Sequence, residues 1–324
     1  MQSVIMQAEH TVVVDPHYTL WAEELGDPDG TPLLLVMGAN ASGIAWPDTL
    51  VDRLAVRHRV VRYDHRDTGR STRAFAVHPY AIRDLADDAL TVLDALGIDR
   101  AHIVGMSMGG TLVQRLLVDH PERLRSATVF ATSALGAGLA DPEGTGPALP
   151  GPDPRLLEMW AEMGDEREPA AELDWRVAHW RILNGDALPF DPAEFRALEE
   201  RVTAHSGTAA ASFAHALADQ GGLGRDPAAL AAVAVPTLVI EAPEDPINPP
   251  PHAQYLAGTR SAPPGSSRSP AWDTPCRRRS CRGWPRRSSP TRPWPTRAPE
   301  AGLASVADLR KAGASICAPP PPRS

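Results

Sequence analysis

The sequence predicts an α/β fold, with a mostly parallel central sheet flanked by helices and a helical cap inserted between two parts of the core. Apolar strand-like runs alternate with helical periodicity over residues 1–135 and resume over 219–258. One run, PLLLVM at 32–37, is apolar throughout, as expected of a strand buried on both faces. Residues 136–218 contain amphipathic helices and Pro/Gly loops without a strand signal, which predicts the cap.

The expected elements follow one another as strands joined by helical crossovers. The first two strands form a hairpin of alternating residues. The helix over 81–96 places Ile82, Leu85 and Leu93 on one face, and Gly97 ends it as a C-cap. In chain order, strands are predicted over 11–14, 19–24, 32–37, 59–63, 102–104, 127–131 and 236–242, and helices over 46–56, 81–96, 109–119, 156–163 and 171–182.

The residues before 259 form an acidic body without cysteine. They carry 19 basic and 37 acidic side chains, a net charge of −18. This charge argues against nucleic acid as a partner, and the lack of cysteine excludes disulfides and thiolate metal sites there. No window approaches the roughly 18 uncharged apolar residues of a membrane span, and the N-terminus lacks the pattern of a signal peptide. We therefore expect a cytoplasmic protein that binds no metal and no membrane, and the oligomeric state stays open.

A nucleophile motif stands between a predicted strand and a predicted helix. Residues 105–109 read GMSMG, a G-x-S-x-G in which Ser107 occupies the strand-to-helix turn. In this position small neighbours let the helix pack closely, and the serine hydroxyl points out at the helix N-terminus. Elsewhere in a chain the pentapeptide would be an ordinary turn. Its context therefore favours Ser107 as a catalytic nucleophile.

Two further features follow other core strands. The loop MGAN at 37–40 leaves the strand at 32–37, where a backbone N–H of an oxyanion hole is supplied in this type of fold. The candidate donors are the N–H groups of Ala39 and Met108, although the loop alone could be a simple glycine turn. Asp245 follows the strand at 236–242, where a carboxylate that orients a catalytic histidine belongs. We prefer it to the adjacent Glu244 because it immediately precedes a turn proline.

Five runs of the chain resemble α/β-hydrolases of the anthracycline methylesterase type, such as aclacinomycin methylesterase. They are LLLVMGANASGIAWPD, VVRYDHRDTGRSTR, HPYAIRDLADDALTVLDALGIDRAHIVGMSMGG, WRILNGDALPFD and PTLVIEAPEDPINPPPHAQYLAG, and they fall within residues 19–258. The resemblance implies removal of the methyl group from a carbomethoxy substituent of an aromatic polyketide during antibiotic biosynthesis. It also implies Ser107 as the nucleophile, Asp245 as the triad acid, and no cofactor.

The chain departs from this family where the catalytic histidine should stand. The histidine should follow the strand after Asp245, but the only histidine beyond that residue is His252, seven positions on and before any further strand. We expect His252 to be structural. The same expectation, of a packed or solvated ring, holds for His65, His102, His205 and His215.

The last 66 residues, 259–324, differ sharply from the body. They hold 13 basic and three acidic side chains, a net charge of +10, and 13 of the 34 prolines. All three cysteines, Cys276, Cys281 and Cys317, lie here. The segment could be a basic tail that contacts acidic partners or nucleic acid, and the Cys276-x4-Cys281 spacing is weak evidence for zinc because no second ligand pair accompanies it.

The genetic code favours another explanation, a shifted reading frame. When each codon is read one base earlier, the junction of Trp272 with Asp273 must encode Gly, and that of Asp273 with Thr274 must encode His or Tyr. The neighbouring codons permit PGMGHALPSS, which resembles the histidine loop of the family. The codons of 265–269 permit a strand and those of 281–292 a helix. We therefore predict that 259–324 is an out-of-frame, disordered tail, with the shift near 259–261, and that the triad histidine is encoded at the Asp273/Thr274 codons.

These features leave more than one function open. The leading prediction is a carboxylic ester hydrolase whose chain lacks its catalytic base and is therefore nearly inactive. Another small-ester or lactone hydrolase of the same fold is the nearer alternative. A homologue that binds a ligand without catalysis is the alternative from another class.

Overall fold

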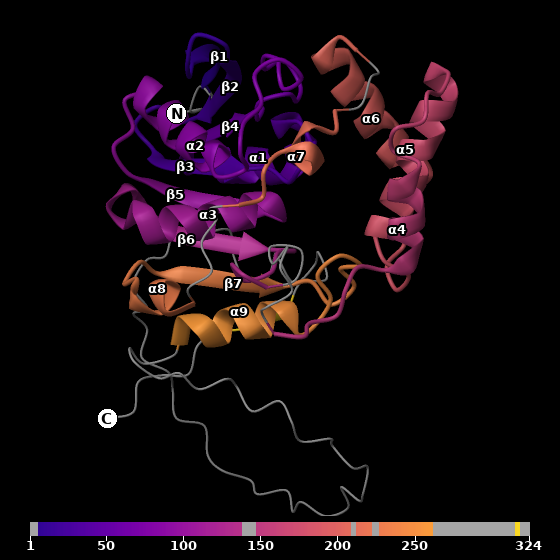
Figure 1. Ribbon diagram of the computed structural model, residues 1–324. Coiled ribbons are helices and arrows are strands. Elements are labelled where there is room, and N and C mark those ends of the chain that lie inside the picture. Colours follow the sequence, from indigo (N-terminus) through magenta and orange to yellow (C-terminus); the bar gives the residue numbers. More distant parts are fainter. Residues whose placement is uncertain (1–5, 138–146, 209–211, 222–226, 262–314, 318–324) are drawn as a thin grey trace, which may run out of the picture.

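The computed structural model describes residues 6–137, 147–208, 212–221, 227–261 and 315–317. They form one eight-stranded sheet flanked by helices, with strand order β1-β2-β4-β3-β5-β6-β7-β8 (Figure 1). The strands are β1 (Met6–Val13), β2 (Thr19–Gly26), β3 (Thr31–Val36), β4 (His58–Tyr63), β5 (Ala101–Met106), β6 (Leu124–Phe130), β7 (Thr237–Glu241) and β8 (Ser315–Cys317).

The centre of the sheet is parallel and its margins are antiparallel. β4, β3, β5, β6 and β7 pair in parallel, while β1 pairs with β2, β2 with β4, and β7 with β8 in antiparallel fashion. Parallel strands align their carboxyl ends, so the loops that follow β3, β5, β6 and β7 meet at one edge of the sheet. This edge carries the candidate active site. The predicted α/β fold is confirmed.

Helices cover both faces of the sheet. Successive residues of β3 alternate between two apolar clusters: Leu33 and Leu35 pack with α1 (Asp48–Ala55), and Leu34 and Val36 pack with α2 and α3. The remaining core helices are α2 (Asp84–Ala95), α3 (Met108–Asp119), α7 (Ala214–Leu217), α8 (Pro227–Ala232) and α9 (His252–Ser261), with 3-10 turns at η1 (Gly43–Ala45) and η2 (Pro121–Arg123).

Three helices between β6 and β7 lie beside the sheet, on the right in Figure 1. They are α4 (Pro154–Ala161), α5 (Pro169–Leu183) and α6 (Pro192–Ser206). Nε2 of His205 lies 2.7 Å from the buried Asp64 carboxylate, and Arg201 is 2.9 Å from that of Asp48. Polar contacts thus attach α6 to the core. The boundaries 136–218 of the cap stay a prediction.

Two predictions from the sequence need a correction in detail. The helix predicted over 46–56 begins only at Asp48, because Trp46 and Pro47 have extended backbone. The segment after residue 259 was predicted to be disordered, but residues 315–317 form a strand that pairs with β7 over three positions. The rest of the predicted out-of-frame segment after residue 261, including the Asp273/Thr274 codon positions, lies outside the described residues. In the described part of the chain, no helix is both long and apolar enough to cross a membrane.

Glycines allow α3 to lie directly against the sheet. A Cβ on Gly109 would come within 2.2 Å of the Val36 carbonyl oxygen, and one on Gly105 within 2.3 Å of the Gly109 carbonyl oxygen. Because these contacts are to backbone atoms, a larger residue could fit only if β3, β5 or α3 moved. The two flanking glycines of the G-x-S-x-G are therefore packing requirements.

We predict that Gly109→Ala lowers the free energy of unfolding by about 3 kcal/mol through overpacking. Gly258→Ala is the matched control, because Gly258 is an exposed helical position in α9 with open space around it. That substitution should leave stability unchanged or raise it by up to about 1 kcal/mol. Urea unfolding of both variants tests the claim, and an unaltered midpoint for Gly109→Ala would contradict it.

Candidate active site

Ser107 occupies a strained turn between β5 and α3. Its backbone has φ 55° and ψ −122°, a conformation that L-residues rarely adopt. Its N–H donates to the Phe130 carbonyl oxygen at 3.1 Å, and its own carbonyl accepts from the Thr111 N–H at 3.2 Å. Such backbone strain costs about 1–3 kcal/mol and persists only where the surroundings enforce it. This is the geometry of a nucleophile elbow, in which the side chain stands at the helix N-terminus.

The loop after β3 passes directly beside this serine. A Cβ on Gly38 would lie 3.3 Å from the Ser107 Cβ, which places the loop within reach of the hydroxyl. Ala39, the predicted oxyanion donor, is the next residue, and Asn40 follows in the left-handed region with φ 57°. Met108, the second predicted donor, is the first residue of α3. The structure therefore brings both predicted N–H groups into the neighbourhood of Ser107.

Asp245 lies in the turn after β7. Its Oδ1 accepts the N–H groups of Ile247 at 2.8 Å and Asn248 at 3.1 Å. The Asn248 side chain donates in turn to the Ala131 carbonyl at the end of β6, which fixes the turn against the sheet. Oδ2 is buried and has no hydrogen-bond partner among the described residues. Burial raises the pKa of this carboxyl, while the two backbone donors act in the opposite direction.

His252 has structural partners at both ring nitrogens. Its Nδ1 lies 2.9 Å from the Ser133 hydroxyl and its Nε2 2.8 Å from the Pro150 carbonyl, and the residue is 1% exposed. The other histidines considered above also have partners: His65 meets the Met37 carbonyl, His102 the Ser126 hydroxyl, His205 the Asp64 carboxylate and His215 the Asn40 amide. In the described part of the chain, therefore, none of these rings is bonded to Asp245.

Sequence reasoning missed Asp64, a fully buried carboxylate just after β4. It accepts hydrogen bonds from the Ser42 hydroxyl at 2.5 Å and from the backbone N–H groups of Gly43 and Arg70 at 2.8 Å. The fourth partner is His205 from α6. The only sequence signal was an acid directly after the strand RVVRY. Asp64 joins the loops after β3 and β4 to the cap helices.

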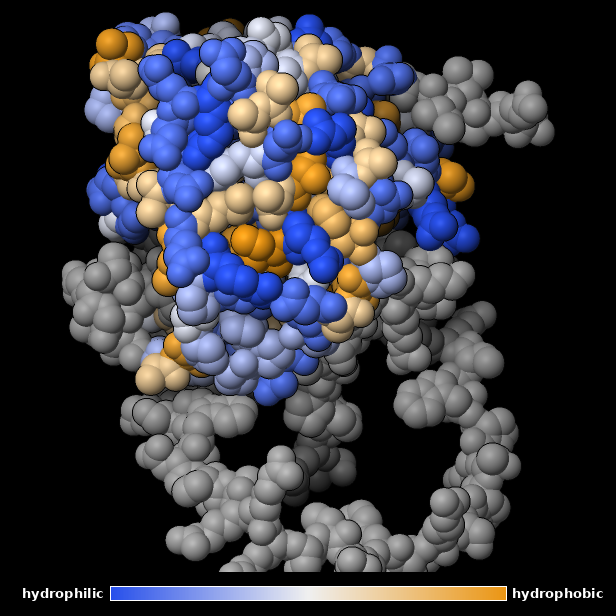
Figure 2. Space-filling view, turned by 90° about the vertical axis from the view of Figure 1, so that its right-hand side faces the viewer, coloured by the Kyte–Doolittle hydropathy of each residue, from blue (hydrophilic) through white to orange (hydrophobic). Residues whose placement is uncertain are grey.

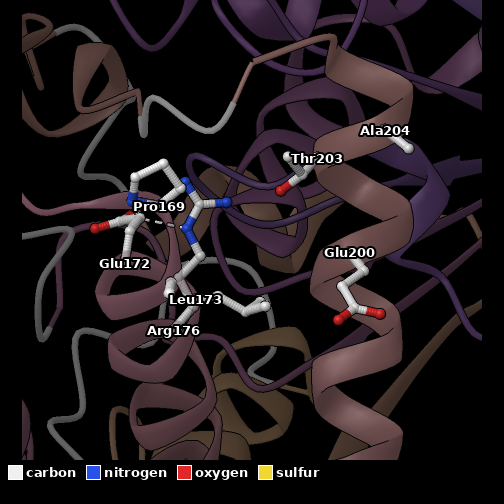
Figure 3. Close-up of a pocket in the computed structure, with 8 residues that line it drawn as sticks. Pro169, Glu172, Leu173, Arg176, Glu200, Thr203 and Ala204 are labelled. Atoms are coloured by element: carbon white, nitrogen blue, oxygen red, sulfur yellow. Dashed lines mark hydrogen bonds and ion pairs between the residues drawn. The ribbon is translucent and has the colours of Figure 1, made fainter.

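A cavity of about 420 Å³ lies between α5 and α6 (Figure 3). Arg176 and Glu172 on its α5 side form an ion pair at 2.8 Å. The cavity is lined by Pro169, Ala170, Glu172, Leu173, Arg176, Glu200, Thr203 and Ala204.

Seen from the side of α4, α5 and α6, the surface carries hydrophobic residues in small groups among hydrophilic ones (Figure 2). No group of three or more metal-binding side chains occurs among the residues described.

Fold and elbow together define an α/β hydrolase, and comparison with known proteins agrees. Residues 31–265 match the family described as alpha/beta hydrolase fold, and the chain belongs to that family. It is 44% identical over 258 residues to the rhodomycin D methylesterase DnrP of Streptomyces peucetius, covering 76% of this chain and 86% of that protein. Identity to DauP of Streptomyces sp. strain C5 is also 44%, over 261 residues and the same shares of both chains. The resemblance to anthracycline methylesterases is thereby confirmed.

Solved structures share the fold at lower identity. A 2-hydroxy-6-oxo-6-phenylhexa-2,4-dienoate hydrolase from Rhodococcus sp. strain RHA1 has a TM-score of 0.61 and 23% identity, over 79% of this chain and 88% of that one. A hydrolase from Pseudomonas aeruginosa has a TM-score of 0.54 and 26% identity, over 78% and 86%. These likenesses support the fold and do not identify the substrate.

We predict that Asp245→Asn stabilises this chain. Because the pKa of Asp245 is raised in the folded state, ionisation above the unfolded value of about 3.9 costs folding free energy, and the cost grows as pH rises through the raised pKa. Removing the charge should add about 1 kcal/mol to the free energy of unfolding at pH 7 and nothing near pH 3. Glu244→Gln, at the exposed neighbour, is the control. A less stable Asp245→Asn protein at pH 7 would show that the carboxylate has a partner.

Proposed function

We propose that this protein is a serine ester hydrolase of the anthracycline methylesterase type, acting on a carbomethoxy group of an aromatic polyketide. The observation that carries the proposal is the 44% identity to two rhodomycin D methylesterases, combined with the strained elbow at Ser107. Ser107 is the nucleophile, Asp245 the triad acid, and the N–H groups of Ala39 and Met108 bind the oxyanion. The reaction needs no cofactor.

The complete mechanism requires a histidine whose ring lies in space between the side chains of Ser107 and Asp245. This base removes the serine proton, the alkoxide attacks the ester carbonyl, and the protonated base delivers that proton to the departing methoxide, which leaves as methanol. Water then hydrolyses the acyl-enzyme by the same route. The Oδ2 of Asp245, which has no hydrogen-bond partner among the described residues, is the acceptor that such an imidazole would use. The match to the hydrolase family ends at residue 265, close to the predicted frame shift at 259–261.

Without the catalytic base, this chain should still bind its substrate but should turn it over only very slowly. Without a general base the rate falls by several orders of magnitude, whereas the oxyanion donors still provide residual catalysis over water. The protein should therefore bind and slowly acylate on Ser107. A noncatalytic binding homologue would show no reaction of this serine at all.

We expect an organophosphonate to label Ser107 slowly but selectively. Ser107→Ala should abolish the labelling, and Ser206→Ala, at the end of α6, should leave it unchanged. Intact mass and peptide mapping measure both results. Labelling of another residue, or labelling that survives in Ser107→Ala, would contradict the assignment of the nucleophile.

We also expect added imidazole to increase hydrolysis of a methyl ester by this chain, because a free ring can act as base beside Asp245. The gain should saturate at about tenfold or more, part of the roughly 10²–10⁴-fold effect of a general base. Initial rates against imidazole concentration, with Ser107→Ala as control, measure the effect. A gain of equal size in the Ser107→Ala protein, or no gain, would show that a missing base does not limit the rate.

A further inference from the structure

His215 contacts the loop that carries the proposed oxyanion donor. It lies on α7, far along the chain from that loop, and is 2% exposed. Its Nδ1 accepts the Asn40 N–H at 2.8 Å, and its own backbone N–H lies 3.3 Å from Asn40 Oδ1. These two contacts attach the segment after the cap helices to the loop after β3.

The second nitrogen of the ring fixes its state. Nε2 lies 3.0 Å from the Arg66 carbonyl oxygen and therefore donates to it. A neutral imidazole has one donor and one acceptor nitrogen, so the contacts require the neutral ring with its proton on Nε2. Burial and the neighbouring His65 lower the pKa of His215 to about 3, in keeping with this state. Protonation at Nδ1 would place two donors against each other.

The loop at 37–40 is held at both ends by buried imidazoles. Nε2 of His65 lies 3.0 Å from the Met37 carbonyl oxygen, and Nδ1 of His215 holds the Asn40 amide. The two rings pack edge to face, with centroids 5.7 Å apart. Asn40 lies in the left-handed region with φ 57°, a conformation that asparagine tolerates better than most residues other than glycine. Between these anchors, Gly38 passes beside Ser107, and Ala39, the proposed oxyanion donor, is the next residue.

We propose that His215 is a positioning residue for the esterase site, which fixes the oxyanion loop 37–40 through its Nδ1 acceptor and ties that loop to the segment leaving the cap. The inference rests on the proposed roles of Ser107 and Ala39. A histidine that only filled space would be replaceable by any side chain of similar volume. A positioning residue is replaceable only by one that keeps the acceptor at Nδ1.

Two substitutions separate these roles. In His215→Asn the amide oxygen can take the place of Nδ1, while in His215→Gln the longer side chain carries its amide toward the Nε2 position. His102→Asn is the control, since His102 is half-buried on β5 and bonded to Ser126 instead of the loop. The readout is the second-order rate at which an organophosphonate reacts with Ser107 in the full chain, because its phosphoryl oxygen occupies the oxyanion site.

We expect His215→Gln to slow this reaction by at least about tenfold, since loss of one oxyanion donor costs roughly 10²–10³-fold. His215→Asn and His102→Asn should stay within about threefold of the wild type. Equal rates for the wild type and His215→Gln, or equal losses in the Asn and Gln variants, would overturn the proposal. If the wild type itself does not react at Ser107, the proposed function fails instead.

A measurement on the wild-type protein tests the same proposal without any substitution at His215, so it remains informative even if the variants do not fold. With ¹⁵N-labelled histidine, the Nδ1 resonance of His215 should report a neutral acceptor and should shift when Ser107 is phosphonylated. The adduct places an oxygen against the Ala39 N–H and so alters the peptide next to Asn40. An unchanged Nδ1 resonance in the fully phosphonylated protein would also overturn the proposal.

Discussion

The strained backbone at Ser107 is the constraint on which the rest of this site depends. A positive φ at a serine survives because β5, β6 and α3 enforce it, and α3 can lie so close only because Gly105 and Gly109 leave no side chain in the contact. The same close packing brings the loop after β3 beside the hydroxyl. Packing of the core and placement of Ser107, the proposed nucleophile, are thus one arrangement, and neither can change alone.

Buried polar groups then connect this arrangement to the cap helices. Asp64 receives His205 from α6, and Asn40 is held by His215 on α7, the helix that follows α6. Asp64 and Asn40 each have hydrogen-bond partners from separate segments, so the loops after β3 and β4 have one favourable arrangement. The Oδ2 of Asp245, by contrast, is one of several buried polar atoms that lack a hydrogen-bond partner within the described chain, and it is the carboxylate oxygen among them. An unsatisfied buried carboxylate is costly, which supports the proposed role of Asp245, because a triad histidine would supply the partner.

Features that depend on consecutive residues could be predicted from the sequence, whereas contacts between distant segments of the chain could not. The elbow, the glycine turn and Asp245 were predictable because each depends on a few consecutive residues after a strand. His215 and Asp64 were not, because their partners lie 175 and 141 positions away and nothing local marks the pairing. Helix α6 was not predicted separately, since the only buried residue of this helix is Glu199 and no apolar stripe marks it. The triad histidine stays a prediction from the codons of residues 273 and 274, which lie outside the described part of the chain.

The most direct measurement compares turnover of a carbomethoxy anthracycline by two purified proteins. One is the chain of this exact sequence, and the other is the product of the same gene with one base inserted near codons 259–261. We predict that the first is nearly inactive and that the second is faster by about 10³-fold or more, as expected when a triad base is restored. Ordinary enzymatic turnover by the first protein would contradict it, because the chain would then hold a working base that this account does not recognise.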